Sequence, residues 1–290
     1  MEKTERIWLD GTLVPWDEAN VHVLTHTLHY GLGVFEGIRC YLCDDGRSAI
    51  FRLREHIDRL YGSAHILDLS MPMPREQVVE ACLEVVRANK LRECYLRPLA
   101  FMGDGEMGLS ARPATRLAIA AWPWGAYLGD EGMKNGIRVK TSSFARFHPN
   151  TLMTKAKACG HYVNSILASR EVRTAGYDEA LMLDTDGYVA EASGENIFIV
   201  SRGVVKTTPL PTVLAGITRD AALAVLGAQG LRIREERFTR DEIYLADEAF
   251  FTGTAAEITP IRELDDRRIG DGRPGPVTRQ VQETFFGIVR

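Results

Sequence analysis

Hydrophobic and polar positions alternate near the start of the chain and then fall into helical spacing. Alternation around Asp10-Gly11 is typical of two strands joined by a tight turn. Apolar residues three and four positions apart, such as Ile57, Leu60 and Ala64, indicate an amphipathic helix. The elements predicted on these grounds are a hairpin over residues 7–16, a second hairpin over residues 35–53 about Asp44-Asp45-Gly46, helices over residues 54–69 and, after Pro72 and Pro74, about residues 78–86, and strands over residues 94–102 and 116–124.

Glycines interrupt the pattern between residues 123 and 134, and no regular period crosses this segment. We expect it to connect two subdomains, residues 1–122 and residues 135–290. The elements predicted in the second are a strand over residues 137–143, a helix ending near Gly176, hairpins at residues 184–187 and 201–203, a helix over residues 216–230 and an amphipathic helix from about Val277. Strands and helices mix without strict β-α-β alternation, so we predict an α+β fold with a small N-terminal α/β subdomain and a larger C-terminal subdomain of mixed α/β structure.

Composition narrows the class of protein. The chain has 290 residues, of which 45% are hydrophobic and 26% are charged, and this is enough apolar material for a buried core. With 35 Lys and Arg against 39 Asp and Glu, the net charge is -4, which removes the usual electrostatic drive for binding nucleic acid or an anionic membrane. The five cysteines are few and odd in number, no signal peptide is apparent, and no run approaches about 18 apolar residues. We expect a cytoplasmic protein with no membrane segment.

The segment Gly103-Asp-Gly105-Glu-Met-Gly108 matches the dinucleotide motif G-x-G-x-x-G but lacks its context. That motif needs a helix to begin at the glycines and an acidic residue about 20 positions later. Here Pro113 and a predicted strand follow, and the required position falls in Trp122-Pro123-Trp124. We interpret the segment as a flexible loop that could cover a site.

Three further patterns suggest metal or thiol chemistry, and each is incomplete. His22, His26 and His29 are spaced for metal binding on a helix, but no carboxylate or thiol motif accompanies them. The segment 184–187 carries its glycine two positions too early for a calcium loop, so it predicts a turn. Cys159 and His161 are neighbours in sequence, whereas a nucleophile and its base normally meet across a fold. We therefore expect no metal site and no cysteine dyad.

Four segments combine small residues with groups that can do chemistry. Thr154-Lys-Ala-Lys157-Ala-Cys-Gly-His-Tyr162 contains two of the seven lysines, although solvated lysines at a helix start would look the same. Leu214-Ala-Gly216-Ile-Thr218 places backbone N–H groups at a helix start, where phosphate binds well, although ordinary capping explains it too. Gly253-Thr-Ala-Ala-Glu257 is a small-residue turn with a hydroxyl group. Glu191-Ala-Ser-Gly-Glu195-Asn196 places two carboxylates before an apolar run.

In this order the segments resemble the branched-chain amino-acid aminotransferases, a family within the fold-type-IV class of pyridoxal-phosphate enzymes. The resemblance covers nearly the whole chain. Its specific blocks are His29-Tyr30-Gly31, Phe35-Glu36-Gly37-Ile-Arg39, Arg54-Glu-His56, Arg59-Leu60, Tyr95-Leu-Arg97-Pro98, Pro123-Trp-Gly-Ala-Tyr-Leu-Gly129, Glu191 to Asn196, Gly216-Ile-Thr218-Arg219, and Gly253-Thr-Ala-Ala-Glu-Ile-Thr-Pro260.

The resemblance implies a set of residues around pyridoxal 5'-phosphate. Lys157 would bind the cofactor aldehyde as the catalytic residue, Glu191 would keep the pyridine nitrogen protonated, and Tyr162 would hydrogen-bond the phenolic oxygen. The remaining cofactor residues that it implies, most of them at the phosphate, are Arg59, Glu195, Gly216, Ile217, Thr218 and Thr254.

It also implies a substrate pocket and a reaction. Arg97 would bind the distal carboxylate of glutamate or 2-oxoglutarate, and an aliphatic side chain would enter the same pocket. The implied pocket residues are Tyr30, Phe35, Gly37, Arg39, Tyr95, Arg97, Met107, Leu109, Trp124, Tyr127, Thr254, Ala255 and Ala256. The implied reaction moves the amino group of L-leucine, L-isoleucine or L-valine to 2-oxoglutarate in a ping-pong cycle. It implies a homodimer or higher homo-oligomer, in which the loop over residues 103–109 reaches a neighbouring subunit's site.

Three positions depart from the family pattern. Cys159 and His161 stand where a glycine and an asparagine are usual, and Lys155 stands where a small residue is common. We prefer Lys157 to Lys155 because Lys157 keeps the family's spacing to Tyr162 and Glu191. The alternatives are a D-amino-acid or (R)-amine transaminase, an aminodeoxychorismate-lyase-like enzyme, and an inactive homologue that only binds metabolites.

Overall fold

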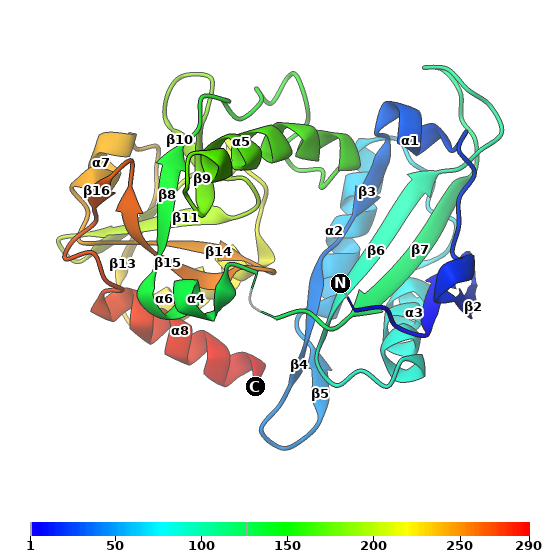
Figure 1. Cartoon of the computed structure of the whole chain (residues 1–290), viewed down its shortest axis with the longest axis horizontal. Coiled ribbons are helices and arrows are strands. Elements are labelled where there is room, and N and C mark those ends of the chain that lie inside the picture. Colours follow the sequence, from blue (N-terminus) through cyan, green and yellow to red (C-terminus); the bar gives the residue numbers. More distant parts are fainter. Residues whose placement is uncertain (1, 126) are drawn as a thin grey trace. The chain divides into compact units, whose positions relative to one another are not determined.

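The computed structural model describes residues 2–125 and 127–290. Met1 of the predicted first subdomain and Ala126 of the predicted connecting segment therefore lie outside the described residues. The chain forms two compact units (Figure 1). The first runs to Trp124 and also includes Lys155–Tyr162 and Val289–Arg290, and the second comprises Gly125–Thr154 and Val163–Ile288.

The first unit is built on an antiparallel sheet. Its strand order is β2-β1-β7-β6-β4-β5, and β3 also pairs with β6. The elements are β1 Arg6–Leu9, β2 Thr12–Pro15, η1 Trp16–Glu18, α1 His26–Tyr30, β3 Gly33–Phe35, β4 Ile38–Leu42, β5 Ser48–Ile50, α2 Leu53–Ile66, α3 Arg75–Ala88, β6 Cys94–Met102, β7 Thr115–Trp122 and the short helix η2 Cys159–His161. Helices α2 and α3 lie against this sheet (Figure 1).

The core of the first unit explains why the spacing of apolar residues predicts its two long helices correctly. Ile57 and Leu60 of α2 and Val85 of α3 are buried, and they pack with Leu96 and Ile119 of the central strands. Burying each such side chain contributes about 1.5–3 kcal/mol. Both predicted helices are confirmed to within a few residues. The second predicted hairpin is longer than the observed hairpin of β4 and β5. Its first residue, 35, belongs to β3, and its last residue, 53, belongs to the first turn of α2.

The second unit contains a larger, mixed sheet with strand order β10-β9-β8-β15-β14-β11-β12-β13, and β16 pairs with β15. Its elements are α4 Gly129–Asn135, β8 Ile137–Thr141, α5 Tyr162–Thr174, β9 Glu179–Leu183, β10 Val189–Ala192, β11 Asn196–Ser201, β12 Val204–Thr207, η3 Leu210–Thr212, α6 Ile217–Ala228, β13 Arg232–Glu235, α7 Arg240–Tyr244, β14 Glu248–Gly253, β15 Glu257–Leu264, β16 Arg267–Arg268 and α8 Pro276–Val289. Helix α5 begins at Tyr162, the last residue that the first unit takes from this part of the chain.

Buried aromatic residues hold the central strands of the second unit. Phe198 of β11 stacks on Phe250 of β14, with ring centroids 5.0 Å apart, and the side chains of Phe238, Phe251 and Phe285 are fully buried. Helix α8 begins where Glu248 accepts hydrogen bonds from the N–H groups of Val277 and Thr278. The hairpins at residues 184–187 and 201–203 and the helices from residues 216 and 277 are confirmed.

The predicted connecting segment contains more structure than its sequence indicated. Helix α4 lies between Gly129 and Gly136, whose φ angles are 78° and 82°. These glycines mark the two ends of a short helix, since a residue with positive φ ends helical geometry. No helix among the described residues is long and apolar enough to cross a membrane.

Candidate active site

The backbone of Lys157 is fixed by two elements of the first unit. Its N–H donates to Ser63 Oγ of α2 at 3.0 Å, and its carbonyl oxygen accepts from the Phe35 N–H of β3 at 3.1 Å. Three residues later the Gly160 N–H donates to the carbonyl oxygen of Gly31 at 3.1 Å. A Cβ on Gly31 would lie only 3.0 Å from the Gly160 Cα, so the close approach favours glycine at both positions. These bonds explain why residues 155–162 group with the first unit, whereas the predicted division placed them in the second.

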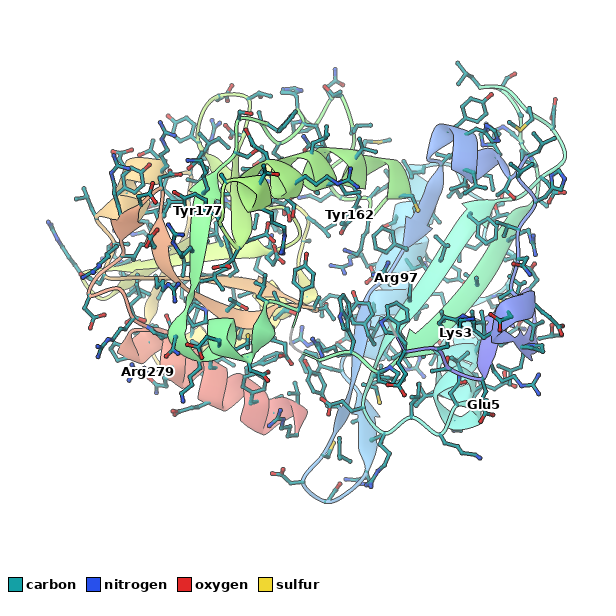
Figure 2. All side chains as sticks on the ribbon, viewed as in Figure 1. Lys3, Glu5, Arg97, Tyr162, Tyr177 and Arg279 are labelled. Carbon is teal, nitrogen blue, oxygen red and sulfur yellow. The ribbon has the colours of Figure 1, made fainter. Side chains whose placement is uncertain are left out.

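The amine of Lys157 lies beside two aromatic rings. Its Nζ donates to the Tyr162 hydroxyl at 2.6 Å and lies 5.0 Å from the Phe35 ring centroid. The Phe35 and Tyr162 rings are themselves 4.9 Å apart, and Tyr162 is labelled at the start of α5 in Figure 2. The side chain of Lys155, two residues earlier, is exposed. The surroundings of the two lysines therefore differ, because Lys157 is held beside a phenol and Lys155 lies at the surface.

Arg59, a predicted cofactor residue, is bound to a buried carboxylate. Glu36 is fully buried, and its Oε1 accepts from Arg59 Nε at 2.7 Å while its Oε2 accepts from Arg59 Nη2 at 2.9 Å. His56 Nδ1 contacts the same Oε2 at 2.7 Å, and this nitrogen must carry the hydrogen because an ionised carboxylate only accepts. The three groups form one hydrogen-bonded cluster, with His56 and Arg59 on α2 and Glu36 in the connection between β3 and β4.

Charge in this cluster is balanced. Burial acts to raise the pKa of Glu36, but the Arg59 guanidinium and the His56 hydrogen bond hold it well below the usual range of a glutamate. Burial lowers the pKa of His56 below 6.5, against the opposing effect of Glu36. At neutral pH one carboxylate therefore faces one guanidinium and one neutral imidazole.

The predicted substrate residues of the first unit surround a guanidinium with aromatic rings. Arg97 (Figure 2) lies over Phe35 at 4.7 Å and over Tyr95 at 5.4 Å, measured from its Cζ to each ring centroid. Tyr95 meets Trp124 edge-on at 4.6 Å, and a Cβ on Gly37 would overlap the Tyr95 hydroxyl. No acceptor among the described residues bonds the buried Arg97 Nε. This corner combines apolar surface with a cation.

The remaining predicted substrate residues of the first unit are Arg39, Tyr30 and two residues of the loop at residues 103–109. Arg39 Nη1 donates to the Trp124 carbonyl oxygen at 3.2 Å, and the Tyr30 side chain is exposed. Met107 and Leu109 are exposed at 37% and 92%. Strand β7 begins at Thr115, and no helix starts at the glycines of the loop, so the dinucleotide motif is confirmed as a loop.

The three early histidines bind backbone atoms. His26 Nε2 contacts the Gly108 carbonyl oxygen at 3.0 Å and His29 Nε2 contacts that of Val23 at 2.8 Å. His22 Nδ1 accepts from the Leu24 N–H at 3.1 Å. Among the residues that the structure describes, no group of three or more His, Cys, Asp or Glu side chains could hold a metal ion.

Glu191 of the second unit is buried, and both of its carboxylate oxygens have polar partners. Its Oε1 lies 2.7 Å from Arg146 Nε, and its Oε2 accepts from Asn196 Nδ2 at 3.3 Å and from the Leu214 N–H at 3.2 Å. Arg146 in turn lies over the Phe147 ring at 4.0 Å. An ion pair at one oxygen and two hydrogen bonds at the other hold this carboxylate in one orientation.

The start of helix α6 lies next to this carboxylate. Asn196 Nδ2 also donates to the Leu214 carbonyl oxygen at 3.0 Å, and a Cβ on Gly216 would overlap Asn196 Oδ1. Gly216 is the N-cap, so it offers no capping side chain to the helix, whose first residues are Ile217 and Thr218. Backbone N–H groups at such a terminus favour an anion.

The last predicted residues, Thr254, Ala255 and Ala256, form the turn between β14 and β15. A Cβ on Gly253 would lie 3.1 Å from Cγ of the buried Glu195, so the turn packs closely on Glu195. Burial, together with the Glu195 and Glu179 carboxylates, raises the pKa of Tyr127 to about 12. Tyr127 is therefore a neutral phenol over the whole physiological range.

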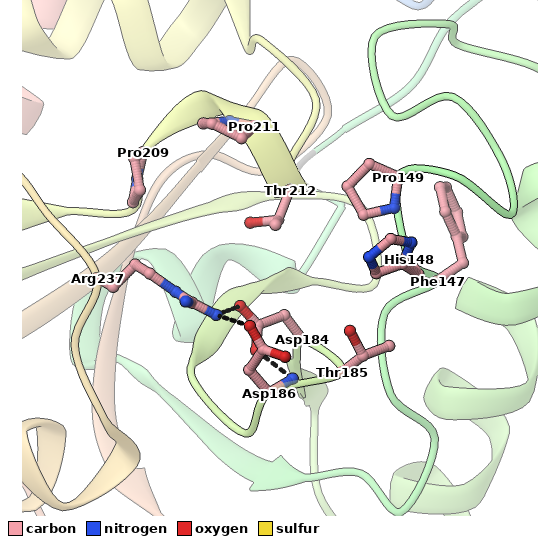
Figure 3. A pocket seen from close by; sticks show the side chains of 10 residues that line it. All are labelled: Phe147, His148, Pro149, Asp184, Thr185, Asp186, Pro209, Pro211, Thr212 and Arg237. Atoms are coloured by element: carbon pink, nitrogen blue, oxygen red, sulfur yellow. Dashed lines mark hydrogen bonds and ion pairs between the residues drawn. The ribbon is translucent and has the colours of Figure 1, made fainter.

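A hollow of about 210 Å³ lies elsewhere in the second unit (Figure 3). Arg237 is its cationic residue, and Arg237 Nη2 lies 2.7 Å from both Asp184 Oδ2 and Asp186 Oδ2. Two carboxylates thus neutralise the guanidinium, and none of the predicted site residues lines the hollow. The turn at residues 184–187 is confirmed, since Asp184 Oδ1 accepts from the Asp186 N–H at 3.0 Å.

The sequence had not given roles to Glu36, His56, Ser63 or Arg146. A signal existed for Glu36, because a charged residue stands between Phe35 and Gly37 in a stretch that is otherwise apolar. For Arg146 and Ser63 no local signal existed, since their partners are 45 and 94 positions away in sequence.

The chain is similar over nearly its whole length to known proteins. Residues 33–264 match the family described as amino-transferase class IV. The branched-chain-amino-acid aminotransferase of Pseudomonas aeruginosa is 54% identical over 284 residues, which cover 98% of this chain and 92% of that protein.

Solved structures of similar proteins have the same fold. The Escherichia coli branched-chain amino acid aminotransferase aligns with a TM-score of 0.97 at 46% identity, covering 99% of this chain and 95% of that one. The T.th. enzyme with pyridoxamine 5'-phosphate aligns with a TM-score of 0.96 at 47% identity, covering 100% and 95%. The same enzyme was also solved with N-(5'-phosphopyridoxyl)-L-glutamate and with 4-methylvaleric acid, and each of these aligns with a TM-score of 0.94 at 45% identity, covering 100% and 95%. The chain has the fold-type-IV architecture, and it belongs to the aminotransferase class IV family.

Proposed function

We propose that the protein is a pyridoxal-phosphate enzyme that transfers the amino group of L-leucine, L-isoleucine or L-valine to 2-oxoglutarate by a ping-pong mechanism. The observation that carries this proposal is the amine of Lys157, which donates to Tyr162 at 2.6 Å from a backbone held by Ser63 and Phe35. The similarity to branched-chain-amino-acid aminotransferases over nearly the whole chain supports the choice of substrates.

The residues present fit pyridoxal phosphate at each of its polar groups. Lys157 and Tyr162 suit the aldehyde and the phenolic oxygen, and the buried Glu191 suits the ring nitrogen. Arg59 and the start of α6 suit the phosphate, because one supplies a positive charge and the other supplies backbone donors. The further residues we assign to this cofactor are Glu195, Gly216, Ile217, Thr218 and Thr254.

When bound, pyridoxal phosphate supplies an aldehyde that accepts the amino group and a ring that draws electrons from the substrate Cα. The Lys157 amine would take the proton from the substrate Cα, which requires an amine that stays close while it is not covalently attached. Tyr162 keeps that amine in place through its hydroxyl. Glu191 holds the proton on the ring nitrogen, and Arg146, Asn196 and Leu214 hold Glu191 in orientation.

Both kinds of amino acid side chain are proposed to enter one pocket. Arg97 binds the distal carboxylate of glutamate, and the faces of Phe35 and Tyr95 accept an aliphatic side chain. The T.th. structures with a glutamate adduct and with 4-methylvaleric acid support this double use. The other pocket residues we assign are Tyr30, Gly37, Arg39, Met107, Leu109, Trp124, Tyr127, Thr254, Ala255 and Ala256.

We further propose that the active form is at least a homodimer. Leu109 is 92% exposed at the end of the loop over residues 103–109, and Met107, two residues before it, is 37% exposed. Contiguous exposed apolar surface is a feature of protein–protein interaction sites. In a dimer this loop would cover the neighbouring subunit's substrate pocket and exclude water during the reaction.

The substrate proposal predicts a specific donor pattern. L-leucine should convert the purified holoenzyme to its aminated form, with loss of the aldehyde absorbance, whereas D-alanine and (R)-1-phenylethylamine should leave the spectrum unchanged. A rapid response to D-alanine or to the amine would assign the chain to a different reaction of the same fold. A protein that contains no cofactor would instead be an inactive homologue.

Lys157→Ala should abolish both turnover and covalent attachment of the cofactor after borohydride reduction. We expect activity to fall roughly a thousandfold or more, because the variant lacks both the nucleophile and the proton carrier. Lys155→Ala is the matched control, since its exposed side chain lies two residues away, and it should retain both properties. Mass spectrometry of the reduced protein identifies the modified lysine. Attachment to Lys155, or normal turnover without Lys157, would contradict the assignment.

Arg97→Met should separate the two substrate classes. Removal of a charge-assisted hydrogen bond predicts that KM for L-glutamate rises roughly tenfold to a hundredfold. KM for L-leucine should change little, because methionine keeps an apolar surface beside Phe35. Arg92→Met is the control for general loss of positive charge, because the Arg92 side chain is exposed. Equal losses with glutamate and leucine would show that Arg97 is not the carboxylate ligand.

Tyr127 should remain protonated well above the range of an ordinary tyrosine. Its pKa is raised from 10.0 to about 12, so its neutral form stabilises the fold below about pH 10, and this contribution is lost as the pH rises toward 12. Between about pH 9 and 11 the tyrosinate absorbance of the wild type and of Tyr127→Phe should therefore coincide. A step near pH 10 that only the wild type shows would refute the raised pKa.

A further inference from the structure

Glu36 is next to proposed substrate residues in sequence, and its side chain contacts a proposed cofactor residue on α2. In the register of β3 and β4 against β6 it stands opposite Pro98, and its N–H donates to the Pro98 carbonyl oxygen at 2.8 Å. Its neighbours Phe35 and Gly37 are substrate residues in the proposed function. Glu36 lies between β3 and β4, where the chain keeps its register against β6 and successive side chains point to opposite sides, so the Glu36 carboxylate points away from them. On that side it meets His56 and Arg59 of α2.

The contacts of Glu36 orient a guanidinium as well as neutralise it. Arg59 donates through Nε and Nη2 to the two carboxylate oxygens, at 2.7 and 2.9 Å, which fixes the plane of the guanidinium. His56 then fixes the carboxylate through Nδ1 at 2.7 Å. The exposed fractions of these side chains are 0% for Glu36, 1% for His56 and 14% for Arg59.

A buried ion pair is often no more stabilising than an apolar replacement, so stability alone is a weak reason for this cluster. Charge balance alone requires only the carboxylate and Arg59. The additional imidazole is neutral, and its hydrogen bond both stabilises the carboxylate and fixes its orientation. The same face of α2 carries Ser63, four residues after Arg59, whose hydroxyl accepts from the Lys157 N–H at 3.0 Å. Residues four apart lie one above the other on a helix.

We propose that Glu36 is a positioning residue: with His56 it fixes the Arg59 guanidinium for the phosphate of pyridoxal phosphate. This inference rests on the proposed function, in which Arg59 binds that phosphate. Glu36 touches neither substrate nor cofactor and acts through Arg59. It also connects the substrate strand at Phe35 to the helix face that carries Arg59 and Ser63, so one buried carboxylate aligns the residues of both groups.

The test compares pyridoxal phosphate with pyridoxal, which lacks the phosphate. Each compound is titrated into the apo form of the full-length protein, and its dissociation constant is measured by absorbance and by quenching of tryptophan fluorescence. For Glu36→Gln we expect the dissociation constant of pyridoxal phosphate to rise roughly tenfold to a hundredfold, as expected for a weakened charge-assisted contact. That of pyridoxal should change less than about threefold, because it makes no contact with Arg59. The phosphorus NMR signal of the bound cofactor should also shift.

Glu76→Gln is the matched control. Glu76 of α3 forms an ion pair with Arg54, which lies on α2 as Arg59 does. The side chains of Glu76 and Arg54 are 71% and 67% exposed. This variant removes an ion pair of the same type without touching the cluster, and it should bind both compounds as the wild type does. If Glu36→Gln does not fold, Glu36→Asp keeps the charge, withdraws the carboxylate by one methylene and is measured in the same way.

Two outcomes would overturn the inference. Glu36 variants that bind both compounds as the wild type does would show that Arg59 needs no positioning, and equal weakening of both compounds would show a merely structural role. Arg59→Gln separates this failure from failure of the proposed function. If Arg59→Gln keeps the preference for pyridoxal phosphate over pyridoxal, Arg59 is not the phosphate ligand and the parent assignment is wrong. If Arg59→Gln loses the preference while the Glu36 variants keep it, only the role of Glu36 is refuted.

Discussion

A transaminase needs an amine that is covalently attached in one state and released in another, yet always within reach of the same carbon atom. In the proposed function that requirement falls on the backbone of Lys157, because the side chain itself would have to move. One hydrogen bond to Ser63 and one from Phe35 fix this backbone to a helix and a strand of the same unit. The Tyr162 hydroxyl then needs to restrain only the end of a flexible side chain. The two kinds of contact thus separate a rigid attachment from a mobile reactive group.

The same principle applies to the buried charges. Glu191 and Glu36 are taken from water, which is costly unless each charge meets an opposite one. Each has an arginine within 2.7 Å and at least one further hydrogen-bond donor. Paired in this way, a carboxylate cannot rotate, and its charge is presented in one direction. Orientation is therefore a consequence of how the cost of burial is met.

Much of this arrangement could be predicted from the sequence, and the part that could not has a common cause. The hairpins at Asp10-Gly11 and Asp44–Gly46 and the helices α2, α3, α6 and α8 follow from local patterns, since turn residues and apolar spacing act over a few positions. Local sequence could not distinguish Lys157 from Lys155, because both stand among small residues; only the resemblance to a family chose between them. Their difference in structure comes from Tyr162, Ser63 and Phe35, two of which are distant in sequence.

Contacts between residues distant in sequence also explain why some further interactions could not be predicted. Arg146 and Glu36 act on residues that the pattern had identified, Glu191 and Arg59, but nothing in a linear sequence states which charges will pair after folding. The assignment of residues 155–162 to the first unit was missed for this reason too, because it depends on hydrogen bonds to Gly31, Phe35 and Ser63. Helix α4 is a different case, in which Gly129 was interpreted as an interruption although it marks the start of a helix that ends before Gly136.

In the proposed function, Arg97 explains how a single surface accepts both an acidic and an apolar side chain. A guanidinium is weakly hydrated and planar, so it can stack on Phe35 and Tyr95 without losing much solvation energy. Stacked in this way it contributes an apolar face toward a leucine side chain and N–H donors at its edge toward a carboxylate. A lysine in the same place would present a strongly hydrated ammonium, which an aliphatic side chain would have to dehydrate. In the proposed function the aromatic residues around Arg97 therefore contribute to the specificity, since they make its charge compatible with an apolar substrate.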